Sequence, residues 1–455
     1  MRIQLNCDHK WRDWAVLSLL KFILENKYNH EVFLVSRNDR DKAEDVFSPH
    51  CIVIPHVNGT SQLEYVKSQK SKSKLVVVLP TEGRPIYKEL LDYFYGDYTD
   101  YNDIDLFLSW NYPITSGIID KKKIATSKIR TIGCPRFDFY SSKYNKTVLN
   151  KVDFSNKYNL ELNKPIVTWA TQYNYARFHM SENDWGVNDL IKNGVGDCFN
   201  KHGYNIGDFP KDQYHERNDA LEAFLSVASE KPEINFIIKP HPAEDSSFYK
   251  EIIKKNNLKN ITFIYHEHIW NILNNSNIHL QRHCTTGIEA WLLEKPTVEM
   301  EMGNSHPFIW KEMSNGSEIA KSKSHLGSII DYYLEGGEIP KKIINSRKEY
   351  LERWFYKVDG NRTLEAAFEI NNLLSKNQRK IKWNFERKVN YQIANHFNLN
   401  WRDFSIRKPF KLKKEIQYEK HNEDYINIVD RYITQFDVKA FIKELEKSNN
   451  ESRIL

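Results

Sequence analysis

The sequence predicts an α/β protein of two doubly wound domains that face a cleft, followed by a basic helical extension. Three observations support this prediction. Short apolar runs alternate with segments of helical periodicity, the alternation begins again after residues 163–165, and positive charge gathers late in the chain. Such alternation is typical of βαβ units around a parallel sheet. We expect domains over 1–155 and 160–360, and a crossing helix with the extension over 361–455.

The first half of the chain contains six runs that suit parallel strands. Residues 75–79 are apolar throughout, as expected for a strand covered on both faces of its sheet. The apolar residues of 14–24 fall on one face of a helix. The predicted strands are 2–7, 31–36, 51–57, 74–79, 104–110 and 129–134, and the predicted helices are 14–24, 61–69 and 86–94.

The second half repeats this pattern around a second sheet. Asp245 and Ser246 form a reasonable N-cap for one of its helices. Residues 173–216 are polar and weakly periodic, which predicts a loop insertion near the cleft. The predicted strands are 166–171, 234–239, 261–265, 278–281 and 297–300, and the predicted helices are 218–228, 246–255, 269–273, 286–293, 347–356 and 363–374.

Composition excludes several classes of protein. With 455 residues, 40% hydrophobic and 13% aromatic, the chain can bury packed cores and is not a disordered protein. The N-terminal residues lack an apolar signal core, so we expect a cytoplasmic protein. Cysteines at 7, 51, 134, 198 and 284 lack metal-site spacing, and we expect reduced thiols.

The basic character of the chain is concentrated in residues 376–420. This segment holds 13 Lys and Arg against 4 Asp and Glu, whereas the rest of the chain is near neutral. The segment either packs its aromatic residues on the main body or lies against an anionic membrane surface; nucleic acid is the least favoured partner. Its aromatic residues are Trp383, Phe385, Tyr391, Phe397, Trp401, Phe404 and Phe410.

The sequence Lys-Pro-His-Pro at 239–242 follows a predicted core strand. Two prolines fix the backbone, so His241 is presented in one direction. A cation and an imidazole at the carboxyl end of a strand suit a phosphate or diphosphate leaving group, which Lys239 and His241 would stabilise. The alternative is a surface histidine in an ordinary turn.

A second candidate begins the helix predicted over 286–293. Thr285 and Thr286 would cap this helix, beside Cys284, and Gly287 would let a ligand approach the backbone. Free N–H groups make such a terminus an anion site. Glu289 lies about one turn further, within reach of a ribose diol. The alternative is an ordinary capped helix.

A third candidate follows the first strand, where five of the six residues 8–13 are ionisable. Asp8 or Asp13 would act as general base or nucleophile, and Lys10 and Arg12 would bind an anionic substrate. The alternative is a helix N-cap with solvated charges. Glu82, after the fourth strand, is a weaker candidate of the same kind.

Several common motifs are absent from the sequence. It contains no phosphate-binding P-loop, no dinucleotide-binding glycine motif, no nucleophile elbow and no zinc-protease motif. No Asp-x-Asp lies in a loop directly after a strand. We therefore expect a metal-independent reaction without a cofactor.

The motifs together resemble those of bacterial surface-carbohydrate (surface polysaccharide) biosynthesis proteins, which have a GT-B glycosyltransferase fold with two Rossmann-like domains. The resemblance covers roughly residues 1–300. The matching motifs are the acidic–x–Lys–x–Arg–acidic pattern at 8–13, Glu82-Gly83, Gly-Cys-Pro-Arg-Phe-Asp at 133–138, Lys-Pro-His-Pro at 239–242, and Cys-Thr-Thr-Gly-Ile-Glu-Ala at 284–290 with Lys295-Pro296.

The resemblance implies transfer of a sugar from a nucleotide donor to a glycan or lipid-linked acceptor during capsule or lipopolysaccharide assembly. By analogy with related enzymes that use CMP-activated acidic sugars, the resemblance implies that His241, Thr285 and Thr286 bind the nucleotide phosphate. A CMP-linked ulosonic acid is the first candidate donor, because Lys10, Arg12 and Arg136 could pair with its carboxylate.

Two other functions fit the same motifs. One is transfer of a phosphoalditol from a CDP-alditol in teichoic-type polymer synthesis, and the other is a non-catalytic sugar-nucleotide-binding protein of an assembly complex. The fold analogy also implies that the helix at 363–374 crosses back to the first domain, and the basic segment suggests a peripheral position at the inner face of the plasma membrane.

Overall fold

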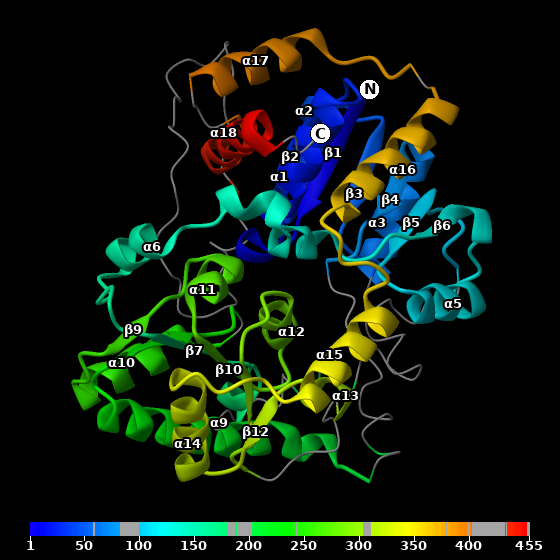
Figure 1. The fold of residues 1–455 in the computed structure, drawn as a ribbon. Helices are drawn as coiled ribbons and strands as arrows, with labels where there is room; N and C mark the ends of the chain where they lie inside the picture. The colour runs from blue at the N-terminus through cyan, green and yellow to red at the C-terminus, as the bar shows by residue number, and fades with distance from the viewer. Residues whose placement is uncertain are drawn as a thin grey trace. The chain divides into compact units, whose positions relative to one another are not determined.

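The computed structural model divides the chain into two compact units. Unit 1 comprises Met1–Thr147 and Trp354–Leu455, and unit 2 comprises Val148–Arg353 (Figure 1). Each unit contains a six-stranded sheet in which every pairing is parallel. The structure describes residues 1–57, 60–81, 100–179, 187–188, 191, 200, 203–242, 244–303, 311–378, 380–397, 401–402, 433 and 435–452.

The sheet of unit 1 has the order β2-β1-β3-β4-β5-β6. After β2 the chain returns to the other side of β1, so the direction of winding reverses between β1 and β3. Ligands of doubly wound sheets bind at this switch point, outside the carboxyl ends of the strands. The strands are β1 (Arg2–Cys7), β2 (Glu31–Ser36), β3 (Cys51–Ile54), β4 (Leu75–Val78), β5 (Leu106–Ser109) and β6 (Ile129–Thr131).

The helices of unit 1 come from both ends of the chain. Helix α1 buries every residue from Asp13 to Leu24 except Lys21, so it is covered on several faces and not only on the single face that its apolar spacing predicts. The predicted helix at 86–94 lies outside the described residues. The helices are α1 (Lys10–Asn26), α2 (Arg40–Phe47), α3 (Thr60–Ser71), α5 (Tyr112–Lys121), α16 (Arg362–Lys376), α17 (Phe385–His396) and α18 (Gln435–Ser452).

The C-terminal helices are part of unit 1. Helices α16 and α18 both pack on α1 (Figure 1). The ring of Phe441 on α18 lies 5.1 Å from that of Trp14, in an edge-to-face arrangement. At the start of α1, the Nζ of Lys10 lies 2.9 Å from both carboxylate oxygens of Asp437. An aromatic contact and an ion pair therefore hold α18 on α1.

Three aromatic residues of the basic segment pack against side chains of β2 and α2. Trp383, Tyr391 and Trp401 surround Phe33 and Phe47, which stack on each other with ring centres 4.0 Å apart. The prediction that these aromatics pack on the main body is confirmed for these three residues.

Two other aromatic residues of the segment face outward. Phe385 is 78% exposed and Phe397 is 65% exposed, at opposite ends of α17. Phe404 and Phe410 lie outside the described residues.

The sheet of unit 2 has the order β12-β11-β10-β7-β8-β9. Winding reverses between β7 and β10, so the carboxyl ends of these two strands flank the switch point. The short edge strand β12 was not predicted. The strands are β7 (Ile166–Ala170), β8 (Asn235–Lys239), β9 (Ile261–Phe263), β10 (Ile278–Gln281), β11 (Thr297–Met300) and β12 (Glu318–Ala320).

The helices of unit 2 include one that corrects the predicted loop at 173–216. Helix α9 begins at Phe209 instead of 218, because its first turns bury residues such as Phe209 and Gln213 among polar neighbours. The helices are α6 (Lys151–Tyr158), α9 (Phe209–Glu230), α10 (Ser246–Asn256), α11 (Ile269–Asn275), α12 (Thr285–Leu292), α13 (Lys311–Ser314), α14 (Lys323–Leu334) and α15 (Lys341–Trp354).

Nowhere in the described ranges does a helix combine the length and the hydropathy that a bilayer crossing requires. Cys7, Cys51, Cys134 and Cys284 are buried free thiols, and Cys198 lies outside the described residues.

Candidate functional site

The two predicted motifs of unit 2 lie at the same edge of its sheet. The Pro-His-Pro turn (residues 240–242) follows β8, and Cys284 to Gly287 follow β10. Strand β7 lies between β8 and β10. All three strands are parallel, so the two strands that carry the motifs lie about 10 Å apart, twice the spacing of neighbouring strands. The sheet order therefore brings both motifs to the switch point.

Residues directly after β7 join the two motifs. The Thr171 N–H donates to the carbonyl of Lys239 at 3.1 Å. The Gln172 amide, in the orientation that satisfies its neighbours, donates to the carbonyls of His283 at 2.8 Å and Arg282 at 3.3 Å. Sequence reasoning missed Thr171 and Gln172 because neither belongs to a recognisable motif.

Glu244 stabilises the Pro-His-Pro turn through its carboxylate. Its Oε1 accepts hydrogen bonds from the Thr171 hydroxyl at 2.7 Å, the Tyr173 N–H at 3.0 Å and the His241 N–H at 3.4 Å. Its Oε2 accepts a hydrogen bond from the Tyr249 hydroxyl. Burial raises the pKa of Glu244 above its usual value, while these donors oppose the rise. Four donors thus fix the backbone that carries His241.

Lys239 also contributes to the position of this turn. Its Nζ donates to the carbonyl of Tyr265 at 2.7 Å, in the segment after β9. The Tyr265 hydroxyl in turn donates to the carbonyl of Pro242 at 3.0 Å. Two hydrogen bonds therefore link the segments after β8 and β9. His241 is partly exposed.

The start of α12 differs from the prediction in one respect. Cys284, rather than Thr285 or Thr286, is the N-cap residue, and its side chain makes no capping hydrogen bond. Thr285 and Thr286 are partly exposed. The Thr286 hydroxyl lies 3.0 Å from Nε2 of His279, a residue whose pKa burial lowers to about 3. His279 is therefore a neutral partner of Thr286.

The choice of glycine at position 287 has a structural explanation that sequence reasoning did not find. A Cβ at this position would lie 3.0 Å from Cδ of Gln281. The Gln281 side chain accepts a hydrogen bond from the Cys284 N–H at 2.8 Å and donates to Glu299 at 2.5 Å. The space beside Gly287 holds Gln281, which is a structural reason for a glycine at this position. Glu289, the predicted ribose partner, is only 2% exposed.

A buried ion cluster supports the turn between β10 and α12. Arg282 lies 2.6 Å from Glu216 and 3.2 Å from Glu299, and all three side chains are at most 4% exposed. Glu299 also accepts the His283 N–H at 2.7 Å. His283 has a φ of +46°, a left-handed conformation that is uncommon outside glycine. This cluster, which sequence reasoning missed, holds the turn in that conformation.

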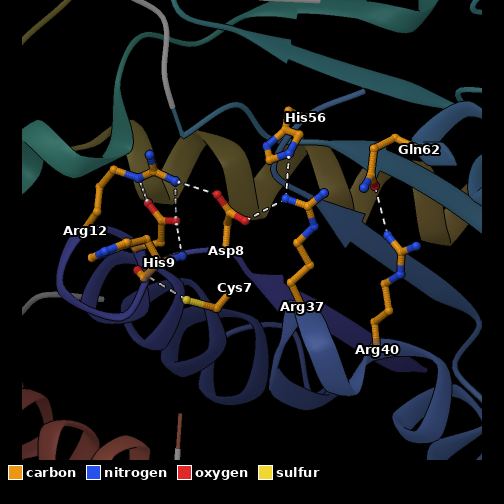
Figure 2. Close-up of polar contacts among 9 residues, drawn as sticks. Cys7, Asp8, His9, Arg12, Arg37, Arg40, His56 and Gln62 are labelled. Atoms are coloured by element: carbon orange, nitrogen blue, oxygen red, sulfur yellow. Dashed lines mark hydrogen bonds and ion pairs between the residues drawn. The ribbon is translucent and has the colours of Figure 1, made fainter. Parts of the chain in front are cut away.

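In unit 1, the ionisable residues after β1 form an ordered network (Figure 2). Asp13 is 1% exposed and accepts hydrogen bonds from the His9 N–H at 3.0 Å and from Nε and Nη2 of Arg12 at 2.7 and 3.0 Å. His9 is the N-cap residue of α1, in place of Asp8. Asp13 thus fastens the first turn of α1.

Asp8 lies between two arginines. Its carboxylate accepts Nη2 of Arg12 at 3.1 Å and Nη1 of Arg37 at 2.9 Å (Figure 2). Burial alone would raise the pKa of Asp8, but the charges of Arg12, His56 and Arg37 outweigh burial and hold it well below its usual range. A carboxylate with so low a pKa is a weak general base.

The Gly-x-Pro-Arg-Phe-Asp motif fastens α16 to unit 1. Gly133 has a φ of +89°, and a Cβ there would lie 2.8 Å from Cδ of Arg362. Asp138 accepts the N–H groups of Arg362 at 3.0 Å and Thr363 at 2.7 Å, at the start of α16. Burial raises the pKa of Asp138 to about 6, although these N–H groups oppose the rise.

Arg136 and Glu82 are the remaining residues that were predicted to bind substrate. Arg136 is partly buried, with its guanidinium carbon 6.0 Å from the ring centres of both Trp110 and Phe137. Glu82 lies outside the described residues. Among the residues that the structure describes, no group of three His, Cys, Asp or Glu side chains is arranged to hold a metal ion.

Comparisons with known proteins identify the fold. No protein-family model and no curated protein sequence matches this chain. The wall teichoic acid polymerase TagF is similar in structure, with a TM-score of 0.53 and 10% identity over 83% of this chain and 90% of that chain. A putative UDP-N-acetylglucosamine 2-epimerase from Listeria monocytogenes has a TM-score of 0.50 and 11% identity over 84% of this chain and 98% of that chain. The chain has a GT-B-like fold of two Rossmann-like units.

Proposed function

We propose that this protein is an enzyme of surface-glycan biosynthesis that transfers a group from a nucleotide-activated donor. The observation that carries the proposal is the position of His241 and Thr285 at the switch point of unit 2, joined through Thr171 and Gln172. The structural likeness to TagF and to a putative 2-epimerase supports this class of enzyme.

In the proposed reaction the nucleotide binds to unit 2 and leaves during transfer. Departure of the nucleotide builds negative charge on its phosphate. His241 and the N–H groups at the start of α12 stabilise this charge, since a fixed donor aimed at developing charge lowers the barrier. Lys239 holds the turn and adds positive charge to this edge of the sheet, and Glu289 is the proposed partner of the ribose.

The first candidate donor is a CMP-linked ulosonic acid. Its carboxylate was expected to pair with Lys10 and Arg12. In the structure, Asp437 holds Lys10, and Asp13 and Asp8 hold Arg12. A sugar carboxylate would therefore compete with carboxylates of the protein, and Arg136 is the remaining proposed partner.

The second candidate is transfer of a phosphoalditol from a CDP-alditol. The likeness to TagF, which has the highest TM-score among the structures compared above, favours this candidate.

A donor-hydrolysis screen distinguishes these candidates. The full chain is incubated with a CMP-linked ulosonic acid, a CDP-alditol and UDP-N-acetylglucosamine, and the released nucleotide is measured. We expect release from one donor, and a loss of about 10²–10³ in kcat for His241→Ala. Glu222→Ala, an exposed change on α9, is the control. Release from none of the donors, or unchanged turnover in His241→Ala, would contradict the proposal.

We also propose that α17 contacts an anionic membrane surface. The exposed Phe385 and Phe397 are the apolar contacts, and the basic residues around them supply the charge. The double change Phe385→Ala with Phe397→Ala should weaken binding to phosphatidylserine vesicles several-fold, whereas Phe368→Ala, 47% exposed on α16, should not. Equal binding of all three proteins would contradict this proposal.

A further inference from the structure

The switch point of unit 1 carries an arginine that the sequence motifs do not include. Arg37 begins the turn after β2, next to β1 in the sheet. Its Nη1 donates to Oδ1 of Asp8 at 2.9 Å and lies 3.3 Å from Nε2 of His56. Asp8 follows β1 and His56 follows β3, so these two residues flank the switch point (Figure 2).

The contacts of Arg37 leave one edge of its guanidinium available. A guanidinium has five N–H groups, and every contact of Arg37 with the described part of the chain uses Nη1. The Nε and Nη2 groups form the fork that binds two oxygens of one anion. The side chain is 28% exposed. With respect to the described residues, Arg37 is therefore anchored at one nitrogen and makes no contact through the other two.

The other cations after β1 are already engaged. Lys10 contacts both oxygens of Asp437, and Arg12 contacts Asp13 through two nitrogens as well as Asp8. An external anion at either residue would compete with a carboxylate that already pairs with it. The Nε and Nη2 groups of Arg37 make no contact with the described residues.

The charge around Arg37 also favours an anion. Arg40, one helical turn further, donates to Gln62 at 2.9 Å and stacks on Tyr65 at 3.9 Å. Its carboxylate neighbour, Asp41, is 3.6 Å away and 78% exposed, so water screens that pair. Arg12 and Arg37 thus share the carboxylate of Asp8, and Arg40 adds a positive charge whose carboxylate partner, Asp41, is screened by water.

We propose that Arg37 binds an oxyanion of the substrate that unit 1 accepts, a phosphate or a carboxylate, through its Nε and Nη2 groups. Asp8 and His56 are positioning residues that hold Nη1. Because an arginine donates only, the contact between Nη1 and Nε2 is a hydrogen bond when His56 is neutral and carries its proton on Nδ1. The proposal rests on the proposed function only for the identity of the molecule that carries the anion.

Titration of the full chain, labelled with ¹⁵N-arginine, tests the proposal. Inorganic phosphate, methyl phosphate and acetate are added in turn at constant ionic strength, and the Nε–H signals are followed by NMR. We expect the Arg37 signal, assigned by its absence in Arg37→Gln, to shift and to saturate. Saturation by the phosphates alone identifies a phosphate site, and saturation by acetate alone identifies a carboxylate site.

Two variants complete the test. Arg37→Lys keeps the charge without the fork, so isothermal titration calorimetry should show affinity for the anion reduced at least fivefold. Arg130→Gln removes an exposed arginine of β6 in the same unit and should leave the affinity unchanged. A linear, unsaturated shift of the Arg37 signal, or equal affinity in wild type and Arg37→Gln, would overturn the inference. Nucleotide binding by unit 2 is measured separately, so failure of the proposed function and failure of this inference remain distinguishable.

Discussion

The hydroxyl of Thr171 lies 2.7 Å from the carboxylate of Glu244 and ties the end of β7 to the turn that carries His241. Neither residue is part of a motif, and 73 positions separate them in the chain. The contact matters because Glu244 also accepts the backbone N–H of His241. It couples the position of the imidazole to the switch point of the sheet.

Removing the Glu244 carboxylate should loosen this arrangement. Glu244→Ala leaves three buried donors without an acceptor, and each such loss costs about 1–3 kcal/mol, so we expect the free energy of unfolding to fall by at least about 3 kcal/mol in urea titrations. Glu244→Gln retains one acceptor oxygen and should fold, with nucleotide affinity reduced about tenfold. Wild-type affinity in the Gln variant would show that Glu244 does not position the site.

Gly287 should be intolerant of a side chain. Gly287→Ala places a Cβ 3.0 Å from Gln281, which must move away from Cys284 and Glu299, so we expect a loss of about 1–3 kcal/mol of unfolding free energy. The control is Gly327→Ala in α14, where nothing lies within 4 Å of the added atom. That change should be neutral or stabilising by up to about 1 kcal/mol. Equal effects of the two changes would argue against the packing account.

Asp138 should determine how firmly α16 is held. Asp138→Ala removes the acceptor for the N–H groups of Arg362 and Thr363, and loss of such a cap costs about 0.5–2 kcal/mol. Hydrogen exchange should therefore accelerate in the first turn of α16, while exchange in α10 of unit 2 stays the same. Asp138→Asn keeps one acceptor and should lie between the two. Unchanged exchange in α16 would contradict the proposed fastening role.

Glu267 should make unit 2 sensitive to acid. Burial alone would raise its pKa. The charge of a neighbouring histidine and three side-chain hydrogen bonds outweigh burial and lower the pKa to about 2; these partners are His268, Asn271, Lys157 and Tyr158. A lowered pKa means that the carboxylate stabilises the fold above the unfolded-state pKa, near 4.5, and that this contribution is lost as the pH falls toward 2. From pH 5 to pH 3 the loss amounts to about 2 kcal/mol.

Urea unfolding at pH 5 and pH 3 tests this dependence. Wild type should lose about 2 kcal/mol more than Glu267→Gln over this range, whereas Glu161→Gln, an exposed change, should behave like wild type. A Gln variant with the same pH dependence as wild type would exclude Glu267 as the source.

The sheets could be predicted from sequence because most of their strands contain short runs of buried apolar residues, which are typical of a parallel sheet covered on both faces. Helix α2 escaped prediction because it buries only Ala43, Glu44 and Phe47 among charged neighbours. Strand β12 has three residues and lies at a sheet edge, and its first two residues are only partly buried.

The candidate site could be predicted only in part, and for a physical reason. His241 and Thr285 lie in recognisable turns at strand ends, where exposed polar residues stand out. Glu244 and Arg37 act through contacts with Thr171 and Asp8, which are distant in the chain and lack a fixed spacing. The packing of Gln281 beside Gly287 could not be inferred from sequence, because no spacing indicates that contact.

The central claim is that the switch point of unit 2 binds the phosphate of a nucleotide through His241 and the start of α12. Isothermal titration calorimetry of the full chain with CMP, CDP and UDP tests it most directly, with Glu222→Ala as the control. We predict saturable binding of at least one nucleotide, weakened at least tenfold in His241→Ala and unchanged in the control. Binding of none of them, or equal affinity in wild type and His241→Ala, would contradict the account.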